Sequence, residues 1–158
     1  MAIQLGRAWD GHGSVTGKWD QPDGYRTIIH EFGHYALGLY DEYLKVRIGP
    51  NREIKDGEPT ARCVDRADQN QNDQPIRGSA MYDQYNTSEF SDVDQPQLWS
   101  DDCKLTKQWK ATAIYLNKAM SAWDTILYYY ADTSHQPPRW QLRKPSQRQP
   151  NQVIEGPE

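Results

Sequence analysis

The sequence His30-Glu31-Phe32-Gly33-His34 restricts the fold of this chain more than any other feature. It has the form H-E-x-x-H. Residues i and i+4 share one face of an α-helix, so His30 and His34 can both direct an imidazole nitrogen at one zinc ion, at about 2.0–2.1 Å. Glu31 then lies beside the metal without binding it, where its carboxylate can take a proton from zinc-bound water. The motif therefore predicts a helix that carries a metal site and a general base.

The residues around the motif predict where this helix begins and ends. Asp23 is a suitable N-cap, and Gly38 can adopt the left-handed conformation that terminates a helix. The helix is short and mostly apolar, as expected for one that is buried on nearly all sides. If His30 and His34 were instead ordinary polar residues of a core helix, each would need a hydrogen-bond partner, and burial of the Glu31 charge would be costly. The metal site is the favoured interpretation.

A catalytic zinc site has three protein ligands and a water, so the motif is one ligand short. Gly38 can turn the chain back, and the ligand-type side chains at a suitable distance beyond it are Asp41 and Glu42. In gluzincins the third ligand is a glutamate on a later helix, for which Glu53, 19 residues after His34, is the candidate. Glycine and proline residues on both sides of Glu53 break any helix there, so Asp41 is preferred.

The composition limits the classes of function. With 158 residues, the chain has the size of one ordinary domain. Its net charge of -4 and its pI near 5.5 argue against binding to nucleic acid or to an anionic membrane surface. No run approaches the roughly 18 apolar residues that cross a bilayer, so membrane insertion is not expected. The mean hydropathy of -0.98 predicts that part of the chain contributes nothing to the core.

Two further features leave alternatives open. Cys63 and Cys103 permit one disulfide, but the sequence does not show whether they lie close together, so a bridge and two separate thiols both remain open. The acidic and amide side chains from Asp65 to Asp73 offer oxygen ligands for calcium. This run lacks the spacing of a calcium-binding loop, so a solvated polar loop is the preferred interpretation.

The pattern H-E-x-x-H-x-x-x-G-x-x-D-E-Y over residues 30–43 resembles the N-terminal hydrolase domain of the calcium-activated chloride channel regulator proteins and their bacterial relatives. It is similar to the metzincin pattern, with the glycine shifted by one residue and an aspartate in place of the third histidine. The likeness is strongest over 30–43 and extends, more loosely, over about residues 22–127. The similar segments outside the motif are Arg62-Cys63, Ser79-Ala80-Met81-Tyr82, Glu89-Phe90, Cys103 and Ser121-Ala122-Trp123-Asp124.

The resemblance implies a metzincin-like zinc peptidase that hydrolyses peptide bonds in a polypeptide substrate. Its zinc ligands would be His30, His34 and Asp41, its general base Glu31, and Met81 would form a methionine turn beneath the zinc. Tyr82 or Tyr85 would be the tyrosine whose hydroxyl stabilises the oxyanion. Proteases of this kind usually act outside the cytoplasm, so we expect an extracellular, periplasmic or cell-surface location, with the cysteine pair in support.

For the fold, we expect an α+β, zincin-like domain over residues 1–133 that is mainly helical. Its elements would be the active-site helix, a C-terminal amphipathic helix of roughly two dozen residues between Leu105 and Tyr130, and a small or truncated N-terminal sheet with a strand over Ala2–Trp9. Residues 49–80 are expected to form a long irregular connection. The Pro- and Gln-rich residues 134–158 predict a linker or disordered tail, as in a longer multidomain protein.

A second class of function competes with the peptidase. The chain can be an interaction module of a larger surface protein, in which a metzincin-like fold is kept and catalysis is weak, self-directed or absent. The presence of the whole catalytic set, Glu31 included, favours the peptidase, because nothing in the fold itself requires the base.

Overall fold

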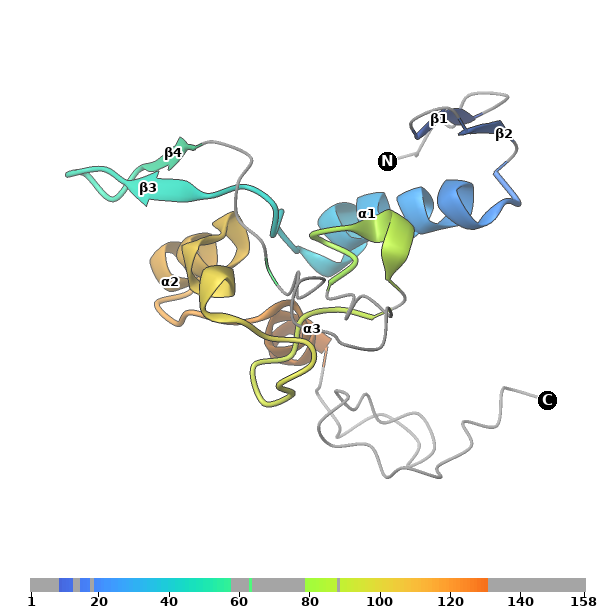
Figure 1. Ribbon diagram of the computed structural model, residues 1–158. Helices are drawn as coiled ribbons and strands as arrows, with labels where there is room; N and C mark the ends of the chain where they lie inside the picture. The colour runs from blue at the N-terminus through green and yellow to red at the C-terminus, as the bar shows by residue number, and fades with distance from the viewer. Residues whose placement is uncertain are drawn as a thin grey trace.

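The computed structural model describes residues 9–12, 15–17, 19–57, 63, 79–87 and 89–130. Over these ranges the chain is α+β and mainly helical, with two small two-stranded sheets (Figure 1). The fold class predicted from the sequence is confirmed at this level. The elements, in chain order, are β1 (Trp9–His12), β2 (Val15–Gly17), α1 (Pro22–Leu37), β3 (Val46–Ile48), β4 (Ile54–Asp56), the 3-10 helices η1 (Gln84–Asn86) and η2 (Asp101–Leu105), α2 (Lys107–Tyr115) and α3 (Ala122–Tyr130).

Both sheets are antiparallel hairpins. β1 and β2 precede α1 and lie beyond its N-terminal end, and β3 and β4 project from the opposite side of the molecule (Figure 1). Of the strand predicted over Ala2–Trp9, only Trp9 lies within the described residues, where it begins β1. β4 lies in the stretch 49–80 that was predicted to be irregular, so that prediction is wrong there. Strands of three residues are too short to display the alternation by which strands are recognised.

Helix α1 begins two residues earlier than predicted, at Pro22, whose fixed φ suits the first helical position. Asp23 is therefore not the N-cap, which is Gln21. Asp23 lies instead in the first turn, where its negative charge interacts favourably with the positive end of the helix dipole. The predicted end is confirmed: Gly38 has φ of 66°, and the amide of Leu39 donates to the carbonyl of Gly33 at 3.0 Å.

The prediction that this helix is buried on nearly all sides is wrong. Its buried residues are Gly24, His30 and Gly33. Its large apolar side chains are 43–49% exposed at Tyr25, Ile29, Phe32 and Tyr35. The described elements cover the face that carries the histidines and leave another face open.

The single C-terminal helix predicted between Leu105 and Tyr130 is two helices. α2 ends at Tyr115 and α3 begins at Ala122. Between them Asn117 has φ of 54°, and Thr112 Oγ1 accepts a hydrogen bond from the amide of Met120 at 2.9 Å. The apolar spacing continues through the break because Met120 is buried along with residues of both helices.

Among the described residues, the buried apolar side chains form two clusters. The larger contains Leu39, Met81, Ala122, Trp123 and Ile126, which bring the end of α1, the 79–82 turn and α3 together. The smaller cluster surrounds a disulfide between Cys63 and Cys103. Of the two possibilities that the sequence left open, a bridge or two separate thiols, the structure has the bridge. No helix of the described residues is long and apolar enough to cross a membrane.

Candidate metal centre

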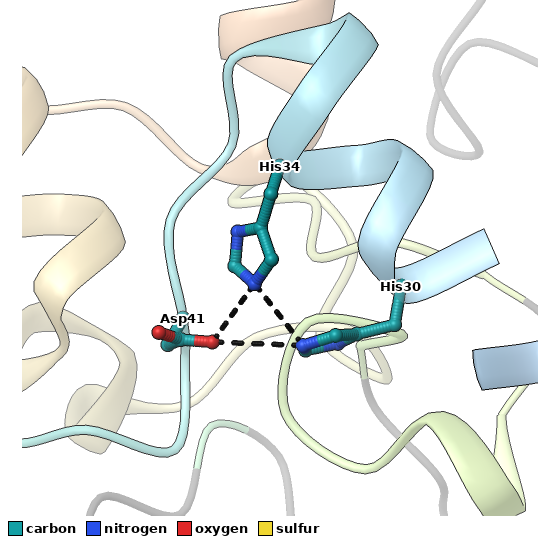
Figure 2. A group of neighbouring side chains, drawn as sticks. All are labelled: His30, His34 and Asp41. Carbon is teal, nitrogen blue, oxygen red and sulfur yellow. Dashed lines mark hydrogen bonds and ion pairs between the residues drawn. The ribbon is translucent and has the colours of Figure 1, made fainter. Parts of the chain in front are cut away.

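His30, His34 and Asp41 direct one ligand atom each at a common point (Figure 2). Both histidines project from α1, and Asp41 comes from the segment that follows the turn at Gly38. The Nε2 atoms of His30 and His34 are 3.1 Å apart. Asp41 Oδ1 lies 3.1 Å from His34 Nε2 and 3.6 Å from His30 Nε2. The three residues that the sequence proposed as ligands are therefore brought together.

The outer nitrogen of each imidazole faces a backbone carbonyl. His30 Nδ1 is 2.8 Å from the oxygen of Ala80, and His34 Nδ1 is 3.0 Å from the oxygen of Leu39. A carbonyl oxygen accepts hydrogen bonds only, so in each neutral ring Nδ1 carries the proton. Both Nε2 lone pairs then point into the group, which is the tautomer that a metal ligand requires.

This arrangement places three acceptors against one another. Asp41 Oδ1 is buried and has no hydrogen-bond partner among the described residues, although it lies at ion-pair distance from both rings. Three facing lone pairs repel one another unless a cation or a proton lies between them. Tetrahedral ligands at 2.0–2.1 Å from one ion are separated by about 3.3 Å, and the three observed separations are 3.1, 3.1 and 3.6 Å. The group can hold a metal ion.

The electrostatics of the group agree with a site built for a cation. The Asp41 carboxylate raises the pKa of His34 above its usual value, although burial acts in the opposite direction. Burial also acts to raise the pKa of Asp41, but the contacts with His30 and His34 outweigh it and hold that pKa well below its usual range. Asp41 is therefore ionised at neutral pH.

The backbone around Asp41 is fixed from two sides. The amide of Tyr40 donates to Gln108 Oε1 at 2.8 Å, and the Asp41 carbonyl accepts from the amide of Gln108 at 3.2 Å. On the other side, the amide of Glu42 donates to the carbonyl of Met81 at 2.9 Å. Helix α2 and the 79–82 turn thus hold the third ligand in place.

The turn over residues 79–82 lies directly beneath the helix that carries the histidines. The amide of Tyr82 donates to the carbonyl of Ser79 at 2.8 Å, which closes the turn. Its Ala80 carbonyl orients His30, and its Met81 side chain is fully buried. A Cβ atom placed on Gly33 would lie 2.6 Å from Met81 Sδ, so the absence of a side chain at Gly33 allows this approach.

Glu31 is exposed on α1, next in sequence to His30. The pKa of His34 is raised first by Asp41 and, more weakly, by the charge of Glu31. Glu31 is therefore close enough to the group to act on it electrostatically, and its carboxylate is open to solvent.

The role proposed from the sequence for the hydroxyl of Tyr82 or Tyr85 stays a prediction. Tyr82 packs against the Cys63–Cys103 disulfide, and the carbonyl of Tyr85 accepts a hydrogen bond from Arg26 Nη1 at 2.6 Å. The structure also places Tyr43 at the group: its ring stacks on that of His30, with ring centroids 6.2 Å apart, and its hydroxyl is close enough to Asp41 for that carboxylate to shift its pKa. Burial and the charge of Asp41 raise the pKa of Tyr43 to about 12, so the hydroxyl keeps its proton.

Sequence reasoning missed Tyr43 and the Ala80 carbonyl as parts of this centre; Glu42, which it considered beside Asp41 for the third ligand, is not in the group. The available signal was the D-E-Y ending of the motif, which puts Tyr43 two residues after Asp41. Glu53, the rival third ligand, lies in the β3–β4 hairpin, where its Oε2 accepts from the amide of Asn51 at 2.9 Å. The proposed calcium loop Asp65–Asp73 and the tail 134–158 lie outside the described residues.

Comparisons with known proteins give no relative: no family model, no curated protein and no solved structure matches this chain. The functional argument therefore depends on the residues and geometry of the centre itself.

Proposed function

We propose that this chain is a zinc-dependent metallopeptidase with a zincin-like, metzincin-type fold, in which His30, His34 and Asp41 hold the zinc and Glu31 is the general base. The observation that carries this proposal is the convergence of three acceptor atoms, with no donor among them, beside an exposed carboxylate. Two imidazoles and one carboxylate are the donor set of many catalytic zinc sites, which leave one position open.

When bound there, zinc would act as a Lewis acid on the scissile carbonyl and would make a water molecule acidic enough to attack at neutral pH. Glu31 would accept the proton of that water on its carboxylate and pass it to the leaving amine. The carbonyls of Ala80 and Leu39 keep the two imidazoles in the required tautomer. Tyr43 stacks its ring on that of His30, and its hydroxyl lies close enough to Asp41 to donate its one proton to that carboxylate.

The remaining expectations stand as parts of the same proposal. Met81 forms the methionine turn beneath the centre, where its burial against Gly33 supports it. The substrate is a polypeptide. The Cys63–Cys103 disulfide is compatible with an extracellular, periplasmic or cell-surface location, because disulfides persist in oxidising compartments.

The test is hydrolysis of casein by the zinc-loaded full chain, beside the variant Glu31→Gln. The variant should keep its zinc and lose hydrolysis by about 100-fold or more, because general-base catalysis contributes roughly 10²–10⁴-fold. Glu53→Gln, which changes an acid of the hairpin, is the matched control and should cleave like the parent. Hydrolysis that persists in Glu31→Gln, or that a zinc chelator does not stop, overturns the mechanism.

One observation favours the interaction module as a second candidate. Successive helical residues differ by about 100° around the axis, so Tyr25, Ile29 and Phe32 share a face that points away from His30 and His34. These side chains are 43–49% exposed, and exposed apolar patches often mark contacts with partners. The module predicts a chain that binds zinc, cleaves nothing, and behaves identically when Glu31 is replaced by Gln.

A further inference from the structure

Glu42, the residue next to the third ligand, is a carboxylate that is only 1% exposed. Charged side chains are rarely buried at this level unless they are paired. Among the described residues, the lysine ion pairs are Lys55 with Glu53 and Lys104 with Asp101, so no lysine compensates Glu42. Its Oε2 has no hydrogen-bond partner within the described part of the chain. Glu42 is not one of the three atoms at the metal group.

A polar network surrounds the other carboxylate oxygen. Ser91 Oγ donates to Glu42 Oε1 at 2.6 Å and accepts from the amide of Ala122, the first residue of α3, at 2.9 Å. Ser79 Oγ accepts from the amides of Met81 and Ser91, both at 3.2 Å. Both serines are 0–1% exposed. One network therefore joins four stretches that are far apart in sequence: Glu42, the 79–82 turn, Ser91 and the start of α3.

This network leads directly to the metal group. The amide of Glu42 donates to the carbonyl of Met81, and the neighbouring Ala80 carbonyl orients His30. The residue before Glu42 is Asp41 itself. A change in how the Glu42 side chain sits must therefore move the backbone of one ligand, the turn that orients another, or both.

Stability alone does not explain a buried carboxylate here. Apolar residues of the same volume often stabilise a protein as well as, or better than, a buried charge, because desolvation of the charge is costly. The N-terminal end of α3 offsets part of this cost, since its positive dipole end faces Ser91. What the carboxylate provides that an apolar side chain cannot is an acceptor that joins Ser91 to the segment carrying Asp41.

We propose that Glu42 is a positioning residue of the metal centre: through Ser91 and the 79–82 turn it fixes Asp41 and the Ala80 carbonyl that orients His30. This inference rests on the proposed metal site. Residues that orient metal ligands in this way typically contribute 10–100-fold to metal affinity.

The test measures the affinity of the full chain for zinc, by competition with a chromogenic chelator, and the visible spectrum of the cobalt(II) form. Glu42→Leu keeps the volume and removes the acceptor, and should weaken zinc binding by about 10–100-fold and shift the cobalt bands. Glu42→Gln keeps an oxygen for Ser91 and should restore binding to within a factor of about three of the parent. Ser91→Ala removes the donor and covers the case in which Glu42→Leu does not fold.

Ile126→Val is the control for general loss of stability. The substitution removes one methyl group from the larger apolar cluster and no polar group. The variant should therefore unfold more easily, while its zinc affinity and cobalt spectrum stay those of the parent. A parent chain that binds no metal overturns the metal site and this inference with it. A parent that binds zinc, with Glu42→Leu and Ser91→Ala equal to it in affinity and spectrum, overturns the inference alone. Glu42→Gln as weak as Glu42→Leu also overturns it.

Discussion

Gly33 is the point at which the motif helix and the 79–82 turn come closest. A Cβ there would lie 2.6 Å from Met81 Sδ and 3.5 Å from Leu39 Cδ1. We expect Gly33→Ala to lower the free energy of unfolding by about 1–2 kcal/mol, because overpacking outweighs the better helix propensity of alanine. Urea denaturation of the parent and the variant measures this difference in the free energy of unfolding. The same change in a Met81→Ala background should cost less, and equal costs in the two backgrounds would contradict the contact.

Tyr43 provides a second prediction at the scale of one residue. Tyr43→Phe removes the hydroxyl that lies close to Asp41 and leaves the ring that stacks on His30. Zinc affinity should fall by about tenfold, the lower end of the effect of losing a partner of a ligand. Competition with a chelator measures the zinc affinity, and Tyr128→Phe, at a tyrosine of α3 that is 56% exposed, serves as the control. If the two variants bind zinc equally tightly, Tyr43 does not support the third ligand.

The residues of the site differ in how far the sequence could identify them. His30, His34 and Asp41 lie within twelve positions, on one helix and the turn after it, so their convergence follows from helical spacing and from Gly38. The Ala80 carbonyl reaches His30 across 50 residues, and Ser91 reaches Glu42 across 49. Such contacts depend on tertiary packing and leave no local pattern.

At the scale of elements, the break between α2 and α3 is the most instructive. The apolar spacing of three or four residues passes through it unchanged, so periodicity alone predicted one helix. The local signals were Asn117, which tolerates positive φ, and Ser121, whose Oγ accepts from the amide of Asp124 at 3.2 Å in an N-terminal cap. The hairpins were missed for a different reason, since their strands are too short for alternation.

Thr112 gives a prediction for this break. Its Oγ1 accepts the amide of Met120 within the buried core, so Thr112→Val leaves that amide without an acceptor. The free energy of unfolding should fall by about 1–3 kcal/mol. Thr27→Val is the matched control on α1, where the hydroxyl bonds only to the Asp23 carbonyl of its own helix, and it should cost less than about 0.5 kcal/mol. Equal losses in urea denaturation would speak against the break.

At the scale of the whole molecule, the disulfide joins two residues 40 positions apart and packs against Tyr82 at the end of the 79–82 turn. Replacement of Cys63 and Cys103 by serine should lower the free energy of unfolding by about 2–4 kcal/mol. The parent should lose the same amount on addition of reductant, and the serine variant should not respond. A parent whose unfolding is unchanged by reduction would show that the bridge does not support this half of the fold.

The low mean hydropathy predicts that part of the chain contributes nothing to the core. Within the described residues, polar side chains such as Gln108, Thr125 and Ser91 are fully buried, as are the apolar clusters. These polar groups are satisfied by one another, as in the bond from Gln108 Nε2 to Thr125 Oγ1 at 2.7 Å. Which polar residues are buried could not be predicted, because burial of this kind requires matched partners from separate elements.

The most direct measurement is the zinc content of the purified full chain, by elemental analysis, beside Asp41→Ala and Glu53→Ala. The parent and Glu53→Ala should each carry about one zinc per chain, and Asp41→Ala should lose it or bind it far more weakly, because two imidazoles alone make an incomplete site. Absence of zinc from the parent after the metal is added back, or retention of zinc by Asp41→Ala with loss from Glu53→Ala, would contradict the metal centre described here.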